Sequence, residues 1–140
     1  MEVLEETNTL VNKKPYAREL IDHWKTPLEF VKSKTADCED YAITKYMILR
    51  KLGYKPMLMY CFIKREAHMV CIVSGFVLDN TTDEIKSLDQ RKDLIEVYRF
   101  SHDCLVVGDH IEYGNPNIKL WNEMLDRMKG EQEKEELNGH

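Results

Sequence analysis

Three residues of the sequence, Cys38, His68 and Asp79, have the side chains that nucleophilic thiol catalysis needs. Cys38 lies in segment 35–42, where an apolar helix is expected to begin. His68 lies in one hydrophobic run and Asp79 ends another. A thiolate can attack a carbonyl carbon when an imidazole, oriented by a carboxylate, takes its proton. The residue types and their order along the chain therefore predict a Cys-His-Asp triad.

The sequence around Cys38 affects its thiol in two opposite ways. A helix N-terminus offers unpaired N–H groups and partial positive charge, which favour the thiolate. The neighbouring carboxylates of Asp37, Glu39 and Asp40 oppose a second negative charge. A protonated His68 beside the sulfur would outweigh them. We therefore expect a reactive thiol at Cys38, whose backbone N–H helps to stabilise an oxyanion.

Each of these residues also has a purely structural interpretation. A histidine on an apolar strand is most often a hydrogen-bonded core residue, and an aspartate at the end of such a run most often forms a turn. The remaining cysteines lie in or beside apolar runs and are expected to be buried free thiols: Cys61, Cys71 and Cys104. Because the sequence has no C-x-x-C pair, neither a structural zinc site nor a thioredoxin-type motif is predicted.

Length and composition are typical of a single globular domain: 140 residues, 43% hydrophobic and 32% charged. The formal net charge of −5 gives no electrostatic reason to expect a nucleic acid partner. No apolar run approaches the ~20 residues of a membrane span. The acidic N-terminus lacks the apolar region of a signal peptide, so a cytoplasmic protein is expected as the sequence is written, and a periplasmic or secreted one if a leader was removed.

The spacing of apolar residues predicts helices, then strands, then a final helix. Helices are expected at 15–24, at 27–34 after a Thr26-Pro27 start signal, from 38 to 52, and from 116 to 128. Strands are expected at 57–63, 67–73, 76–79, 95–100 and 104–107, with 109–113 extending the last and 80–84 as a polar loop. Short turns join only antiparallel neighbours, so the fold class is α+β with an antiparallel sheet. One domain is expected over 1–129, followed by a disordered charged tail at 130–140.

Four blocks of the sequence carry a resemblance to a known family: Trp24-x-x-Pro27-x-Glu29, Ala36-Asp37-Cys38-Glu39-Asp40, His68-Met69-Val70 and Val77-Leu78-Asp79-Asn80. Together they resemble the bacterial transglutaminase-like cysteine peptidases of the papain-like/transglutaminase-like superfamily. The resemblance implies a Cys-bearing helix packed on an antiparallel sheet. It also implies Cys38 as nucleophile, His68 as base and Asp79 as the orienting acid. The sequence departs from the pattern at Ala36, where a glycine is usual, and in its shortness.

Some members of that family need calcium, which the carboxylates flanking the cysteine bind. By resemblance, the metal ligands here would be Asp37 and Glu39, although no cofactor is required for the thiol chemistry itself. Carboxylate oxygens suit Ca²⁺. The alternative is that these two residues are helix N-terminal carboxylates that complement the helix dipole.

The predicted function is a thiol-dependent hydrolase that cleaves peptide amide bonds through a thioester intermediate, with a peptide or protein as substrate. Two alternatives remain open. The same triad could transfer the acyl group to an amine, as transglutaminases do. A non-catalytic module of the same fold could instead bind a protein partner through the helix that contains Trp121 and through the acidic tail.

Overall fold

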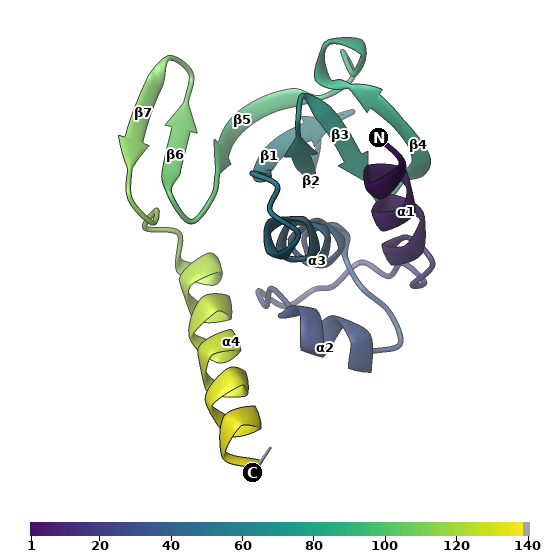
Figure 1. Cartoon of the computed structure of the whole chain (residues 1–140). Coiled ribbons are helices and arrows are strands. Elements are labelled where there is room, and N and C mark those ends of the chain that lie inside the picture. The colour runs from purple at the N-terminus through teal and green to yellow at the C-terminus, as the bar shows by residue number, and fades with distance from the viewer. Residues whose placement is uncertain (139–140) are drawn as a thin grey trace.

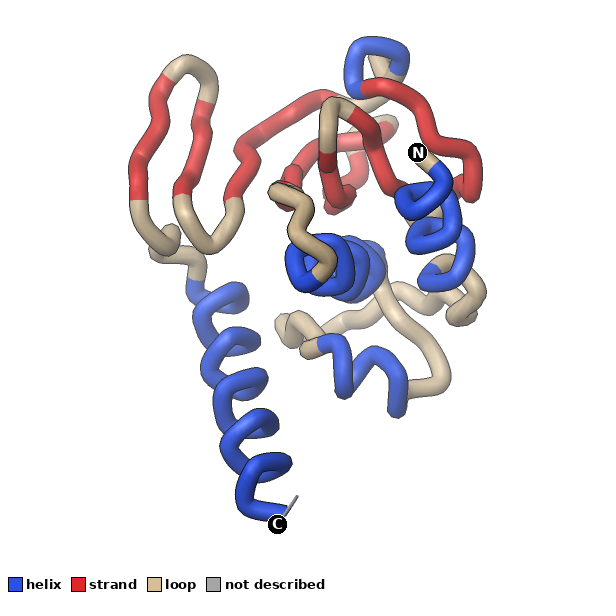
Figure 2. The backbone as a smooth tube through the Cα atoms, in the orientation of Figure 1, coloured by secondary structure: helices blue, strands red, loops and turns tan. Residues whose placement is uncertain are grey.

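The computed structural model describes residues 1–138, which form a seven-stranded antiparallel sheet with helices on one side (Figures 1 and 2). The strand order is β4-β3-β2-β1-β5-β6-β7. The helices are α1 (Glu2–Val11), α2 (Pro27–Lys32), α3 (Cys38–Lys51) and α4 (Lys119–Asn138), with a 3₁₀ turn, η1 (Leu88–Gln90). The strands are β1 (Met57–Ile63), β2 (Glu66–Val73), β3 (Phe76–Asp79), β4 (Thr82–Ser87), β5 (Ile95–Phe100), β6 (Cys104–Val107) and β7 (His110–Tyr113). This architecture confirms the predicted α+β class.

Helix α3 lies at the centre, with the sheet arched over it (Figure 1). Its apolar side packs against β1, β2, β3, β5 and α4, and this side is built from Ala42, Ile43, Tyr46 and Leu49. Burying a large apolar side chain contributes about 1.5–3 kcal/mol, so this cluster holds α3, with Cys38 at its first position, firmly on the sheet.

Helix α4 completes the same core through Trp121, which is fully buried. The indole stacks edge to face on Tyr46 and Phe100, and its N–H donates to Asn115 Oδ1 at 2.9 Å. Trp121 itself is therefore not available to a partner, because its ring is already enclosed within its own chain. None of the helices within residues 1–138 is long and apolar enough to span a membrane.

The local sequence signals that predict where helices begin and end are confirmed for α2 and α3. The Thr26 N–H donates to Glu29 Oε1 at 2.8 Å, and the Glu29 N–H donates to Thr26 Oγ1 at 3.1 Å. This reciprocal capping box starts α2 at Pro27, as expected. Gly53, with φ of +95°, follows the end of α3 in the left-handed conformation that glycine adopts without strain.

The helix predicted at 15–24 is wrong, because tertiary hydrogen bonds hold this segment in a non-helical path. Tyr16 pairs with Ala36 in a parallel bridge, and the Ala17 N–H donates to the Ala36 carbonyl at 3.0 Å. Two of the apolar residues that suggested a helical face find no packing surface: Leu20 is 94% exposed and Ile21 73% exposed. Apolar residues at helical spacing do not stabilise a helix when they have no surface to pack against.

Two further segments differ from expectation. The predicted polar loop at 80–84 contains the start of β4, an edge strand whose polar residues face solvent. The segment 130–140 was expected to be disordered, but in the structure α4 continues through it as far as Asn138. The Thr26 hydroxyl donates to Glu131 Oε2 at 2.7 Å, which ties this part of α4 to the start of α2. Residues 139 and 140 lie outside the described residues.

Candidate active site

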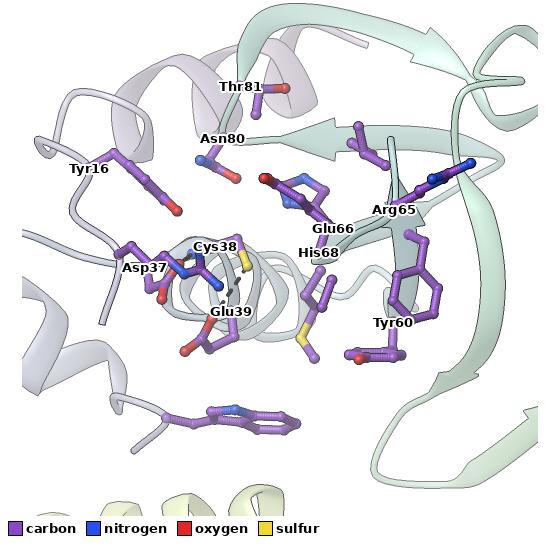
Figure 3. Close-up of a pocket in the computed structure, with 16 residues that line it drawn as sticks. Tyr16, Asp37, Cys38, Glu39, Tyr60, Arg65, Glu66, His68, Asn80 and Thr81 are labelled. Carbon is purple, nitrogen blue, oxygen red and sulfur yellow. Dashed lines mark hydrogen bonds between the residues drawn. The ribbon is translucent and has the colours of Figure 1, made fainter. Parts of the chain in front are cut away.

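The three residues predicted to do chemistry come from the ends of three neighbouring elements. Cys38 is the first residue of α3, His68 lies near the start of β2, and Asp79 is the last residue of β3. Cys38 and His68 line the same pocket, of about 890 Å³ (Figure 3). A pocket of this size is in the range that small ligands and peptide side chains occupy.

Asp79 and His68 form a buried hydrogen-bonded pair. His68 Nε2 lies 2.8 Å from Asp79 Oδ1, and Asp79 is only 1% exposed. The Thr81 N–H donates to the same oxygen at 3.1 Å. When Nε2 carries the ring proton and donates a hydrogen bond to Asp79, Nδ1 is the ring nitrogen that can exchange a proton with a nucleophile. The pair therefore has the arrangement of a base and its orienting acid.

Arg91, which follows η1, completes the hydrogen bonding of Asp79. Its Nη2 donates to Asp79 Oδ2 at 2.9 Å and also contacts Asp93 Oδ2 at 3.0 Å. Burial alone would raise the pKa of Asp79, but the hydrogen bonds from His68, Thr81 and Arg91 outweigh it and hold that pKa well below its usual range. Arg91 could not be predicted as a site residue, because the charged stretch at 89–93 resembles an ordinary solvated turn.

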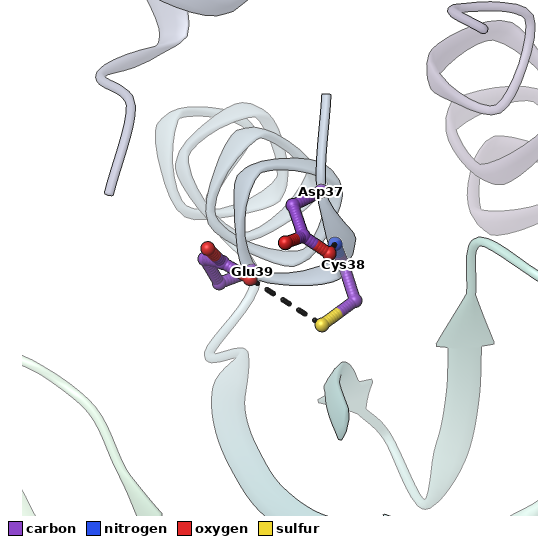
Figure 4. A group of neighbouring side chains, drawn as sticks. All are labelled: Asp37, Cys38 and Glu39. Carbon is purple, nitrogen blue, oxygen red and sulfur yellow. Dashed lines mark hydrogen bonds between the residues drawn. The ribbon is translucent and has the colours of Figure 1, made fainter. Parts of the chain in front are cut away.

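Cys38 is half-buried, and both of its hydrogen-bond donors point to the acidic residues beside it (Figure 4). Its thiol donates to Glu39 Oε2 at 3.4 Å, and its backbone N–H donates to Asp37 Oδ1 at 2.7 Å. Over residues 1–138 no hydrogen bond joins the Cys38 sulfur to His68. The structure thus pairs His68 with Asp79 and brings Cys38 into their pocket without completing the chain of hydrogen bonds.

Two expectations about Cys38 need correction. Burial, and then the charges of Glu39 and Asp37, raise the pKa of its thiol well above the ordinary value, so burial and the carboxylates together oppose the thiolate in this arrangement. The Cys38 N–H, expected to face an oxyanion, is instead held by Asp37 as part of the helix cap. The direction in which the flanking carboxylates turn explains the second correction and contributes to the first, after burial.

Those carboxylates form an acidic cluster at the rim of the pocket. One oxygen each from Asp37 and Glu39 lies within 4.8 Å of the other and of the Cys38 sulfur (Figure 4). Asp37 Oδ2 also accepts from the Glu19 N–H at 2.9 Å. Burial, with the charges of Asp40 and Asp37, raises the pKa of Glu39 to about 7. Two carboxylates this close repel one another, and a cation would relieve that repulsion.

Residues outside the predicted set also line the pocket. Tyr16, Arg18 and Trp24 come from the segment that was expected to be a helix. Burial and then Asp37 raise the pKa of Tyr16 to about 12. The sequence indicated Trp24 as part of a motif and as an apolar residue of the helix predicted at 15–24. It could not show that this non-helical segment contributes Tyr16, Arg18 and Trp24 to the lining of the pocket.

Comparison with solved structures shows the same fold in LapG of Legionella pneumophila. EGTA-treated LapG aligns with a TM-score of 0.82 and 28% identity, over 89% of this chain and 77% of that chain. Calcium-bound LapG aligns with a TM-score of 0.79 and 29% identity, over 89% and 78%. A comparison with curated protein sequences gives no match.

A sequence profile described as "Bacterial transglutaminase-like cysteine proteinase" matches residues 1–100. The match includes α3, β2 and β3, and so contains Cys38, His68 and Asp79. The transglutaminase-like fold that the sequence blocks implied is therefore confirmed. The chain belongs to the bacterial transglutaminase-like cysteine proteinases and is a cysteine peptidase.

Proposed function

We propose that Cys38, His68 and Asp79 are the catalytic residues of this peptidase, which hydrolyses amide bonds in protein substrates. The observation that carries the proposal is the buried His68–Asp79 hydrogen bond of 2.8 Å beside the pocket into which α3 brings Cys38. A buried imidazole–carboxylate pair next to a thiol at a helix N-terminus is the arrangement that thiol catalysis uses.

The chemistry follows from these positions. His68 Nδ1 takes the proton from the Cys38 thiol, and the sulfur attacks the carbonyl carbon of the substrate amide. When the tetrahedral intermediate collapses, the C–N bond breaks, His68 returns the proton to the leaving amine, and a thioester remains on Cys38. His68 then takes a proton from water, which attacks the thioester and releases the carboxylic acid and the free thiol. Asp79 accepts from Nε2 throughout and stabilises the imidazolium.

Two hydrogen bonds of Cys38 must change before this sequence can begin. The thiol has to leave Glu39 Oε2 and turn to His68, because the proton must pass to the imidazole. The backbone N–H has to leave Asp37 Oδ1 if it is to donate to an oxyanion. The carboxylates of Asp37 and Glu39 therefore control whether Cys38 is free to react.

Asp37 and Glu39 are also the residues that we propose hold a calcium ion. Their oxygens converge, and within the described chain no basic side chain lies within salt-bridge distance of Glu39. The half-buried carboxylate of Glu39 therefore has no protein cation to balance it. An oxygen-preferring divalent cation fits such a pair. When bound, it would neutralise the negative charge beside Cys38. A calcium-bound form of LapG supports the assignment.

We expect calcium to stabilise the folded protein through Asp37 and Glu39. A ligand at 100 times its dissociation constant stabilises the native state by about 2.7 kcal/mol, so CaCl₂ should raise the melting temperature relative to EGTA. The measurement is thermal unfolding of the wild type and of Asp37→Asn/Glu39→Gln, which should lose the response. The control is Asp109→Asn/Glu112→Gln, which removes the same charges from exposed positions of the β6–β7 hairpin. Equal melting temperatures in CaCl₂ and EGTA would rule out the calcium site.

The proposed activity is tested with a defined mixture of synthetic peptides, incubated with the protein in CaCl₂ and analysed by mass spectrometry. Hydrolysis yields pairs of products with new amino and carboxyl termini, and alkylation of Cys38 by iodoacetamide should stop their formation. An added primary amine separates the two chemistries, because acyl transfer would join the amine to the new carbonyl end. Cleavage that continues after complete alkylation of Cys38 would overturn the proposal.

A further inference from the structure

The proposed reaction places a negative charge on the substrate oxygen, and this oxyanion needs hydrogen-bond donors. As the Cys38 sulfur adds to the carbonyl carbon, the electron pair of the C=O bond moves to oxygen. The Cys38 N–H is one candidate donor, and in this structure it donates to Asp37. Because the leaving nitrogen faces His68, which protonates it, the oxygen points away from the imidazole. A second donor is therefore needed in the same pocket, across the sulfur from His68.

The hydroxyl of Tyr16 lies on that side of the pocket. Tyr16 lines the same pocket as Cys38 and His68. In Figure 3 its ring points inward from the pocket wall, and its hydroxyl and the His68 ring lie on either side of the Cys38 sulfur. Tyr16 is 55% exposed, so a substrate that enters the pocket can reach its side chain. A phenol O–H is one of the side-chain donors that can stabilise an oxyanion.

The backbone around Tyr16 is fixed to the residues that lead into α3. Tyr16 and Ala36 form a parallel bridge, two residues before Cys38. The Ala36 N–H donates to the Pro15 carbonyl at 3.1 Å, and the Ala17 N–H donates to the Ala36 carbonyl at 3.0 Å. Tyr16 is thus held on both sides against the segment that carries the nucleophile. A donor that is fixed before the reaction needs no reorganisation when the charge forms.

The ring of Tyr16 takes no part in the core of the protein. It belongs to none of the hydrophobic clusters within residues 1–138, and none of the aromatic pairs there includes it. Burial, and then the charges of Asp37 and Cys38, raise the pKa of Tyr16 to about 12. The hydroxyl therefore keeps its proton at neutral pH and remains a donor.

We propose that Tyr16 is a catalytic residue whose hydroxyl donates a hydrogen bond to the oxyanion that forms when Cys38 attacks the substrate. No proton is transferred: the Tyr16 O–H bond stays intact, and the electron pair returns to the C=O bond when the C–N bond breaks. The same hydrogen bond forms again when water attacks the thioester. The inference rests on the proposed role of Cys38 and adds the group that stabilises the charge which that attack creates.

The test is Tyr16→Phe, which removes the hydroxyl and keeps the ring. On a peptide that the wild type cleaves, kcat should fall about 10²-fold with little change in KM, because the oxyanion exists only after the attack. Alkylation of Cys38 by iodoacetamide should keep its wild-type rate, because the sulfur displaces iodide and no oxyanion forms. The melting temperature should stay at the wild-type value, since the ring lies outside the core. The control is Tyr113→Phe on β7, an 83% exposed tyrosine, which should keep the wild-type kcat.

A kcat for Tyr16→Phe within about threefold of the wild type would overturn the inference. Equal falls in hydrolysis and alkylation would do the same, because Tyr16 would then act on the reactivity of the thiol and not on the oxyanion. A large fall in melting temperature would show a structural role for the hydroxyl and would also contradict the inference. Failure of the proposed function is distinguishable, because hydrolysis and alkylation would then be unchanged in His68→Ala. If the Tyr16 inference alone fails, both reactions still depend on His68.

Discussion

Replacing Cys38 by serine is expected to reduce peptide hydrolysis by about 10⁴-fold or more, because a hydroxyl in this acidic, half-buried position cannot replace the thiol as nucleophile. The matched control is Cys104→Ser on β6, which replaces another half-buried cysteine whose sulfur has only a 3.9 Å contact with Ser101 Oγ. That variant should retain the wild-type rate. The measurement is the initial rate of product formation on a peptide that the wild type cleaves.

A Cys38→Ser protein that hydrolyses the peptide at more than about one hundredth of the wild-type rate would exclude Cys38 as the nucleophile. Both variants should unfold at the same urea concentration as the wild type, since a serine is close in size to a cysteine. If Cys38→Ser is as stable as the wild type, its loss of activity is due to the chemistry of residue 38 and not to unfolding.

Replacing Asp79 by alanine should have the largest effect on stability. Asp79 is 1% exposed and accepts hydrogen bonds from His68, Thr81 and Arg91. Removing one partner of a buried charged pair costs about 3–5 kcal/mol, a large fraction of the 5–15 kcal/mol that usually stabilises a domain. Urea unfolding measures the change. Hydrolysis should also fall steeply, because His68 loses the carboxylate that orients it.

Asp93→Ala is the control for Asp79→Ala, because Asp93 contacts the same arginine but has a side chain that is 52% exposed. Exposed ion pairs contribute about 1 kcal/mol or less, so this variant should be close to wild type in stability and activity. A cost for Asp79→Ala no greater than that for Asp93→Ala would contradict the buried pair.

The pH dependence of stability tests whether the pKa of Asp79 is lowered in the folded protein. The folded-state pKa of Asp79 lies below its unfolded value of about 3.9, so its contribution is complete above that pH and is lost as the pH falls toward the folded pKa. The urea midpoint of the wild type should therefore fall between pH 5 and pH 3 by more than that of Asp79→Ala. Parallel curves for the two proteins would show that Asp79 has no such shift.

The sequence alone predicted the elements that depend on local signals. Capping and apolar spacing correctly placed the capping box at Thr26 and Glu29, the helix that begins at Cys38 and the two strands that contain His68 and Asp79. These features arise from residues close together in the chain. The same blocks carried the family resemblance, so the fold and the peptidase activity could be inferred before the structure.

Features that depend on distant residues could not be predicted. The helical spacing at 15–24 gave the wrong structure because acceptors at Ala36 and Asp37, far along the chain, bind the backbone of this segment. Arg91 approaches Asp79 only once β4 has folded back on β3. The sequence indicated both charge effects on the Cys38 thiol, but the burial of the thiol and the direction of the Asp37 and Glu39 side chains are set by the fold.

The central claim is that Cys38, His68 and Asp79 act as one unit, and the most direct test is the rate at which iodoacetamide labels Cys38 in CaCl₂. Mass spectrometry locates the label, and the rate is followed from pH 5 to pH 9 in the wild type and in His68→Ala. We expect labelling at neutral pH to fall by about 10²-fold in His68→Ala, because the imidazole no longer takes the thiol proton. The same labelling rate and pH profile in both proteins would contradict the account.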